Sequence, residues 1–277
     1  MTKEKFNELG ARLSRILTLR YSPIAMKLVF SEDEIPEGTH RPHKDKGEHL
    51  AMCQAFALVR RNRMAVTMLR EDHWCVWPLI SYRHEKLDSD DVETVSDKFF
   101  MANKDDGRRH ILEEYPMLKD REPLGFTIAP LESCAFEPEI ICIYCRPAQV
   151  RTLMMAAKYK CGKMFDLTMD AVDSCVYSTI PVLNGQSFNV TFPDPGEYER
   201  ALADEDEVMF TFRAERLEDI MSAIEMLHRA KFDYQGLVMD MTRDFARPPF
   251  YEALFKKWGL DSGEMWQASH KGSMPQD

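Results

Sequence analysis

The chain has 277 residues and a formal net charge of −10, and 44% of its residues are hydrophobic and 30% charged. Nucleic-acid backbones attract basic surfaces, so an acidic chain with no basic run is not expected to bind nucleic acid. The apolar stretches are far shorter than the roughly 20 residues that span a bilayer, and the charged N-terminus lacks the apolar core of a signal peptide. We therefore expect a cytoplasmic protein with neither a nucleic acid nor a membrane as its partner.

Hydrophobic periodicity predicts the elements of the first half in turn. Apolar residues recur at helical spacing from Phe6 to Leu17, and this helix should end near Arg20 because Ser22 precedes a proline. The elements that follow are a strand at residues 24–30, a long polar loop at 31–49, a helix at 50–62 and a strand at 64–69. Residues 85–123 are charged and contain glycine and proline, which makes them the best candidate for a boundary between two halves.

The second half also combines strands and helices. Pro147 fits the first position of a helix that continues to about Lys160. The predicted elements are strands at 124–129, 139–144, 164–169, 187–192 and 207–212, and helices at 147–160, 171–182, 217–229 and 250–258. We expect residues 1–260 to form one globular domain and the polar residues 261–277 to form a flexible tail.

The two halves, at about residues 21–84 and 124–183, look alike. Each contains a strand, a helix with a glutamine, a second strand with a threonine, and then a cysteine, Cys75 or Cys175. The threonine precedes the cysteine by eight residues in the first half and by seven in the second. The pattern predicts an α/β fold, or a mixed α+β fold, in which two related βαβ-type halves surround one core. An N-terminal helix and a C-terminal helical extension flank them. Chance likeness of short segments is the alternative.

Six short motifs stand in order along the chain: Tyr21-Ser-Pro-Ile-Ala-Met-Lys27, Cys53-Gln54, Glu71-Asp72 to Cys75, Ala129-Pro130-Leu131-Glu132, Pro147-Ala148-Gln149 and Asp173-Ser174-Cys175. In this order and spacing they resemble an uncharacterised family called domain of unknown function 169, whose members come largely from archaea and anaerobic bacteria. The resemblance covers roughly residues 8–230. It implies that Cys53, Cys75 and Cys175 stand at the family's cysteine positions, and it implies little about chemistry.

Seven cysteines in a chain expected in the cytoplasm favour thiols or metal ligands over a disulfide framework. Cys53, Cys75 and Cys175 come from separate elements. Three thiolates can hold an iron–sulfur cluster with an open fourth corner, or a zinc ion with one further ligand. His73 is a candidate for that ligand, and His49 is another. Buried free cysteines also serve as small apolar packing residues, so a metal-free core is the alternative.

Two other patterns could carry metal or redox chemistry. Cys142 and Cys145 form a C-x-x-C, but Cys142 lies within a predicted strand, where side chains three residues apart point to opposite faces. A redox pair instead opens a helix. His40, His43 and His49 lie in the long loop, and with a nearby thiol they are enough ligands for zinc.

Four polar residues are candidates for binding a cofactor or a small anion in the cleft between the halves. Lys27 is a cation in an otherwise apolar strand, although it could instead pair with Glu71. Glu132 follows the end of another strand, where the ligand crevices of α/β sheets lie. Gln54 and Gln149 occupy matching places in the two predicted helices.

The first functional hypothesis is a cysteine-ligated metal or iron–sulfur protein that acts as a redox enzyme or accessory factor in anaerobic metabolism. The second is a metal-free module that binds a small anionic molecule in the cleft. The third is a structural subunit of a larger complex or oligomer. The chain carries no P-loop, no G-x-G-x-x-G, no G-x-S-x-G and no H-E-x-x-H motif. Its residues therefore indicate no particular reaction.

Overall fold

The computed structural model describes residues 1–98, 101–162, 165–170, 172–230 and 247–260. Residues 1–234 form one compact unit, and residues 235–277 form a second unit whose described part contains helix α11 (Pro249–Lys257). The predicted tail at 261–277 lies outside the described residues. A single domain over residues 1–260 stays a prediction.

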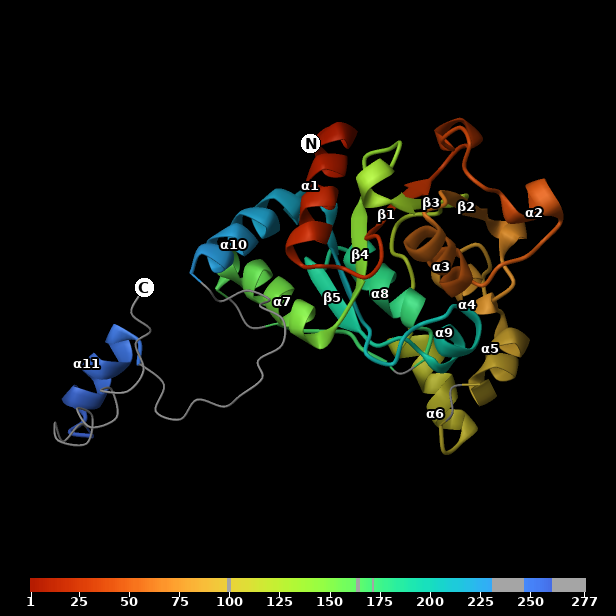
Figure 1. The fold of residues 1–277 in the computed structure, drawn as a ribbon. Coiled ribbons are helices and arrows are strands. Elements are labelled where there is room, and N and C mark those ends of the chain that lie inside the picture. Colours follow the sequence, from red (N-terminus) through yellow and green to blue (C-terminus); the bar gives the residue numbers. More distant parts are fainter. Residues whose placement is uncertain (99–100, 163–164, 171, 231–246, 261–277) are drawn as a thin grey trace. The chain divides into compact units, whose positions relative to one another are not determined.

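A six-stranded antiparallel sheet is the framework of the first unit in its described residues (Figure 1). In order across the sheet, the strands are β2 (Val66–Leu69), β3 (Gly125–Pro130), β1 (Ile24–Val29), β4 (Ile140–Cys145), β6 (Val208–Arg213) and β5 (Phe188–Thr191). Ile24 of β1 lies opposite Pro130 on one side and Cys142 on the other. Because β1 and β2 both run antiparallel to β3, they run parallel to each other, and the same holds for β4 and β5 around β6.

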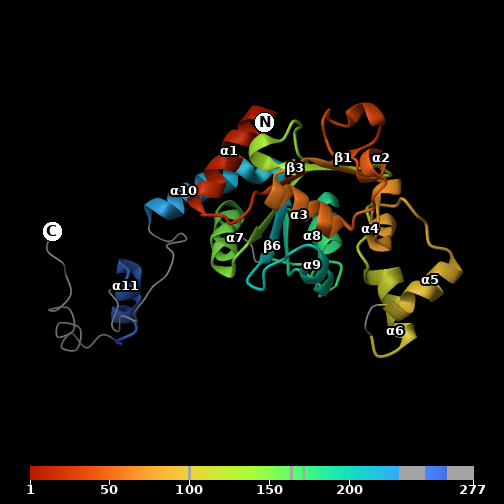
Figure 2. The same cartoon turned by 45° about the vertical axis from the view of Figure 1, so that its right-hand side comes forward.

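Helices cover both faces of this sheet, which confirms the mixed α/β fold with an N-terminal helix. Strand alternation sends Met26 into the core on one face and Ala25 into the core on the other. Figure 2 shows α1 beside α10 on one of these faces, where α7 also packs. The helices on that face are α1 (Lys3–Ile16), α7 (Pro147–Cys161) and α10 (Leu217–Arg229). Those on the other face are α3 (Met52–Asn62), α4 (Val76–Ser81) and α8 (Ser174–Leu183).

Short helices form in segments with clear start signals. Pro42 stands at the first position of α2, inside the segment predicted as a loop. Helix α9 was not predicted. Among the described helices, none is long and apolar enough to cross a bilayer. The short helices are α2 (Pro42–Lys46), α5 (Ser89–Val95), α6 (Lys104–Arg109) and α9 (Pro195–Arg200).

The strand order is the same on the two sides of the central β1–β4 pair, with β3 and β6 in corresponding places. The crossover helices also start alike. Gln54 is the third residue of α3, and its side chain accepts a hydrogen bond from the Ala51 N–H at 2.9 Å. Gln149 is the third residue of α7 and accepts from the Arg146 N–H at 2.7 Å. A duplicated strand–helix–strand unit would have these features, and the duplication itself stays a prediction.

The strand predicted at 164–169 is wrong for its described residues, which have no regular secondary structure. Thr168 instead exchanges two hydrogen bonds with the side chain of Asn189 in β5, at 3.1 and 2.7 Å. The Asn189 amide also donates to the Tyr177 carbonyl at 2.7 Å. That carbonyl lacks its helical partner because Pro181, four residues later in α8, has no N–H. Asn189 therefore completes α8 and fixes the neighbouring segment in place of a strand.

Replacing this amide with an apolar side chain of similar size, Asn189→Leu, should lower the free energy of unfolding by about 2–4 kcal/mol. The reason is that buried backbone groups of Thr168 and Tyr177 lose their partner. Urea denaturation measures the change. Asn62→Leu, at an exposed position, is the control and should change the value by less than about 0.5 kcal/mol. Equal stability of the two variants would contradict the role given to Asn189.

Candidate functional site

A cavity of about 480 Å³ opens where the first turns of α3, α4, α8 and α9 meet. Cys53, Cys75 and Cys175 all line it. The family resemblance links all three, and the proposed repeat links Cys75 with Cys175; the fold places all three in the wall of one cavity. Cys53 and Cys175 are 6% and 7% exposed, and Cys75 is partly buried.

Each of the three cysteines stands at the start of a helix. Cys53 is the second residue of α3, Cys175 is the second residue of α8, and Cys75 immediately precedes α4. Backbone N–H groups in a first helical turn have no acceptor within the helix and favour negative charge nearby. One of these groups, the N–H of Trp77, acts to lower the pKa of the Cys75 thiol, although burial outweighs it. The positions therefore suit thiolates once the thiols lose their protons.

Burial keeps these thiols protonated in the absence of a bound cation. It raises the pKa of Cys53 to about 12, with further contributions from Glu197 and Asp194. Burial likewise raises the pKa of Cys75 to about 11 and holds that of Cys175 well above its ordinary value. The thiolate form therefore needs compensation from a cation or a metal.

One carboxylate caps two of the helices around the cavity. Asp194 accepts hydrogen bonds from the Ser174 N–H at 2.8 Å and the Ser174 hydroxyl at 3.0 Å, at the start of α8. It also accepts from the Glu197 N–H at 3.0 Å, at the start of α9. Sequence reasoning missed α9, although an aspartate, then Pro195 at the first helical position, then Glu197 at the third is a recognised helix-start signal.

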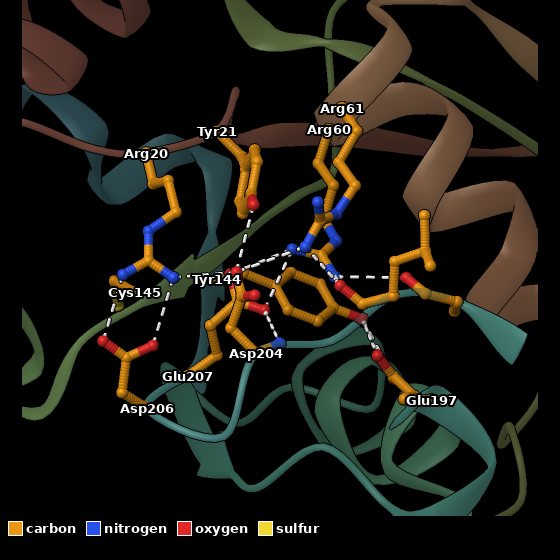
Figure 3. Close-up of polar contacts among 12 residues, drawn as sticks. Arg20, Tyr21, Arg60, Arg61, Tyr144, Cys145, Glu197, Asp204, Asp206 and Glu207 are labelled. Carbon is orange, nitrogen blue, oxygen red and sulfur yellow. Dashed lines mark hydrogen bonds and ion pairs between the residues drawn. The ribbon is translucent and has the colours of Figure 1, made fainter. Parts of the chain in front are cut away.

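The C-terminal end of α9 is held by Arg60, from the last turn of α3 (Figure 3). The Arg60 guanidinium donates to both carboxylate oxygens of Glu207 at 2.9 and 3.0 Å. It also donates to the carbonyls of Ala201 and Leu202, which directly follow α9, at 3.3 and 3.2 Å. Both members of the ion pair are at least 97% buried, because their side chains are 1% and 3% exposed. This network fixes α9 against α3 and so sets the position of its last residue.

Glu197 is a fully buried acid on α9, directly behind the cavity wall. Its carboxyl group accepts hydrogen bonds from the Tyr144 hydroxyl at 2.9 and 2.7 Å and from the Ser174 hydroxyl at 2.8 Å (Figure 3 shows the contact with Tyr144). Burial raises the pKa of Glu197 to about 7, and the neighbouring Asp194 raises it further, against the hydrogen bonds that lower it. The folded protein thus holds a proton at this position below neutral pH.

Arg200, the last residue of α9, is a cation in the cavity wall. Its guanidinium acts to lower the pKa of the Cys53 thiol, against the effect of burial, and lies 5.2 Å from the centre of the Trp74 ring. Asp173 lines the same wall in a left-handed conformation with φ of 53°, which is rare for a residue other than glycine and often marks a functional site. Burial raises the pKa of Asp173 to about 7.

His73, predicted as a metal ligand, does not line the cavity. It is 8% exposed and packs 5.8 Å from the Phe126 ring and 5.9 Å from the His84 ring. Burial lowers the pKa of His73 to about 3, and neither ring nitrogen has a hydrogen-bond partner among the described residues. Its neighbour Trp74 does line the cavity, so these two adjacent side chains lie in different environments.

The predicted ligand-binding residues also lie elsewhere. Lys27 follows Met26 in β1 and so belongs to the face opposite the cysteines. Glu132 accepts hydrogen bonds from Ser22 and Arg63 at the end of β3. The two glutamines fix helix starts, and Gln149 also donates to the carbonyls at the end of α1. None of the four lines the cavity.

The remaining cysteine and histidine patterns do not form one site. Cys142 packs in the core on one face of the sheet and Cys145 in the core on the other, as strand alternation predicts. His40 lies 3.0 Å from the Asp45 carboxylate, and the rings of His43 and His49 lie 5.1 Å apart. Across the described residues, no three histidine, cysteine, aspartate or glutamate side chains are arranged to hold a single metal ion, and this includes Cys53, Cys75 and Cys175.

Comparison with known proteins gives a family and no chemistry. The model of the family domain of unknown function 169, described as "Uncharacterised ArCR", matches residues 12–223. The chain is 25% identical over 228 residues to "Uncharacterized protein MJ0308" of Methanocaldococcus jannaschii, and the match covers 81% of this chain and 96% of that protein. No solved structure gives a significant match.

Cys75 in metal-free protein should react with iodoacetamide about 100-fold more slowly than an ordinary thiol near pH 8, because its raised pKa leaves little thiolate. The rate should increase with pH until the pH approaches about 11. Mass spectrometry of the labelled peptide measures it, with the same cysteine in urea-unfolded protein as control. Equal rates in the folded and unfolded protein would show that the thiol is not perturbed.

Glu197→Gln should flatten the dependence of stability on pH. The folded pKa of about 7 exceeds the ordinary value of 4.5, so between these values the folded protein holds a proton that the unfolded chain has released. Stability therefore falls as pH rises across that window. Relative to wild type, the variant should gain about 3 kcal/mol of unfolding free energy from pH 4.5 to 7. Urea denaturation at several pH values tests this, with the exposed Glu199→Gln expected to follow wild type.

Proposed function

The chain belongs to the family domain of unknown function 169, and we propose that it is a cysteine-ligated iron–sulfur protein that serves anaerobic metabolism as a redox enzyme or accessory factor. The observation that carries the proposal is that Cys53, Cys75 and Cys175 line one cavity. No histidine lines it, and thiolate ligands favour soft or borderline metals.

Three features around the three sulfurs support the proposal. Cluster and thiolate sulfurs are stabilised by N–H donors, and their hydrogen bonds help to set the reduction potential. The Trp77 N–H favours the thiolate of Cys75, and the Arg200 guanidinium favours the thiolate of Cys53. The aromatic side chains of Trp74 and Trp77 supply apolar walls.

Three protein ligands would leave one corner of a four-iron cluster open to the cavity. A cluster with an exchangeable corner can transfer electrons or polarise a small molecule bound there. The protein's own contribution would be to orient that molecule between Trp74 and Arg200 and to keep Glu197 protonated behind the wall. Because the free thiols are protonated near neutral pH, loading must release protons and should be favoured by higher pH.

Protein purified without oxygen should contain stoichiometric iron and acid-labile sulfide and absorb in the visible range. Each of Cys53→Ser, Cys75→Ser and Cys175→Ser should lose most of the iron, because one of only three ligands is removed. Cys134→Ser is the matched control. This buried thiol is hydrogen-bonded to Asn7, away from the cavity, so the control should keep its iron.

Two results would refute the proposal. One is full iron retention in all three cysteine variants. The other is a wild-type protein that holds no iron even after anaerobic reconstitution with iron and sulfide. Circular dichroism of each variant separates loss of the ligand from loss of the fold. Stoichiometric zinc in place of iron would also refute the cluster, while leaving the three cysteines as ligands.

A further inference from the structure

We infer that the cysteine-lined cavity also binds a small oxyanion, a carboxylate or phosphate group, through the guanidinium of Arg200. The inference rests on the proposed function for its meaning, since the anion would belong to a substrate that reaches the open corner. Anion binding itself, however, is a property of protein groups and can be measured without a metal.

Three features define the position of Arg200. The guanidinium packs against Gly196, where a Cβ atom would force it to shift. The Trp74 ring, which is 60% exposed, lies 5.2 Å from the guanidinium carbon, at a distance typical of a cation–π contact. Arg60 anchors the chain immediately after Arg200. The cation is thus held against the cavity from three sides.

Arg200 has donors to spare. A guanidinium carries five N–H donors in a rigid fork that matches a carboxylate or phosphate. Its Nε is buried and has no partner among the described residues. Its ion pair is with Glu199, the preceding residue, at 3.1 Å, and that carboxylate is 75% exposed. An exposed pair of this kind contributes little to stability, so a ligand anion can displace it.

The start of α3 adds to the attraction for an anion. Its N-cap residue is Ala51, which has no side-chain oxygen, and the first bond within the helix runs from the Ala55 N–H to the Ala51 carbonyl. The N–H groups of Met52 and Cys53 consequently have no acceptor among the described residues. Ala51, Met52 and Cys53 all line the cavity beside Arg200. Unsatisfied N–H groups of a first turn favour a bound anion.

The acidic residues in the wall do not cancel this preference. The Asp194 oxygens are engaged by Ser174 and by the Glu197 N–H. Asp173 accepts a hydrogen bond from the Tyr115 hydroxyl at 3.0 Å. Lys98 supplies a second cation, which is exposed and forms no ion pair among the described residues.

The cavity also limits the size and shape of the ligand. Its volume of about 480 Å³ lies in the range of small-molecule sites, about 300–1,000 Å³. Besides Arg200, the wall presents the aromatic faces of Trp74 and Trp77 and the apolar side chain of Val76. The fitting ligand is therefore a small molecule that carries at least one oxyanion group.

The test is a titration of metal-free protein with malonate and with inorganic phosphate, followed by tryptophan fluorescence. Trp258→Phe and Trp266→Phe leave only the emission of Trp74 and Trp77, which both line the cavity. We expect saturable binding of at least one anion, and none of uncharged malonamide. Arg200→Gln should weaken binding at least about tenfold, as expected for a lost charge-assisted hydrogen bond. Arg200→Lys should also weaken it, because the fork is lost.

Two matched variants sharpen the result. Arg151→Gln removes an exposed arginine of α7, outside the cavity, and should leave the dissociation constant unchanged. Glu199→Gln removes the competing carboxylate and should tighten binding. Preference for malonate or for phosphate identifies the group on the ligand. Absence of binding to both, equal binding of malonamide, or an unchanged dissociation constant in folded Arg200→Gln and Arg200→Lys would overturn the inference.

The outcome is separable from that of the iron measurement. Anion binding that depends on Arg200 in a protein that takes up no iron would support this inference and refute the cluster. Iron held by the three cysteines, together with no anion binding in either the metal-free or the loaded protein, would support the cluster and refute this inference.

Discussion

The buried ion pair of Arg60 and Glu207 is the contact on which the site depends. It joins the last turn of α3 to the start of β6, and the same guanidinium holds the carbonyls after α9. Burial raises the pKa of Glu207 in spite of the nearby Arg60. Removing the two charges from water therefore has a cost, and within the buried pair each charge stabilises the other. Loss of one partner from such a pair generally costs about 3–5 kcal/mol, because the other charge stays buried and uncompensated. The walls that carry Cys53 and Arg200 would lose their common anchor with it.

Helix α9 connects the Arg60–Glu207 ion pair to the other elements around the cavity. It is only six residues long, yet its N-cap Asp194 also caps α8, and its Glu197 joins α8 to β4 through Ser174 and Tyr144. The position of Cys175 is therefore set by contacts with α9, and the position of Arg200 is set by the contact of the next residue, Ala201, with Arg60. Three cysteines from distant parts of the chain meet because one short helix is bonded to the elements that carry two of them. A rigid frame of this kind can hold reactive groups in an otherwise apolar cavity.

Much of the fold could be predicted because its signals are local. The amphipathic helix at 217–229 and the apolar strand at 140–145 follow directly from their periodicity, with an error of one residue at most. The sheet order could not be predicted, because it is set by pairing between distant strands. The site was predicted through its cysteines, whereas Arg200 was missed because the start signal at Asp194 was not read as a helix. His73 was also predicted as a ligand, from its proximity in sequence to Cys75, but the cavity is lined by Trp74 and Cys75 and not by His73.

Pro181 in α8 bears on how the protein matures. Because the proline leaves the Tyr177 carbonyl without a partner in its own helix, α8 reaches its full hydrogen bonding only when Asn189 arrives with β5. Cys53 and Cys75 are synthesised more than a hundred residues before that strand. During synthesis on the ribosome, Cys53 and Cys75 are therefore present before the cavity that they line is complete. Any cofactor carried by all three sulfurs is consequently acquired after synthesis of the second half, as a late step in biogenesis.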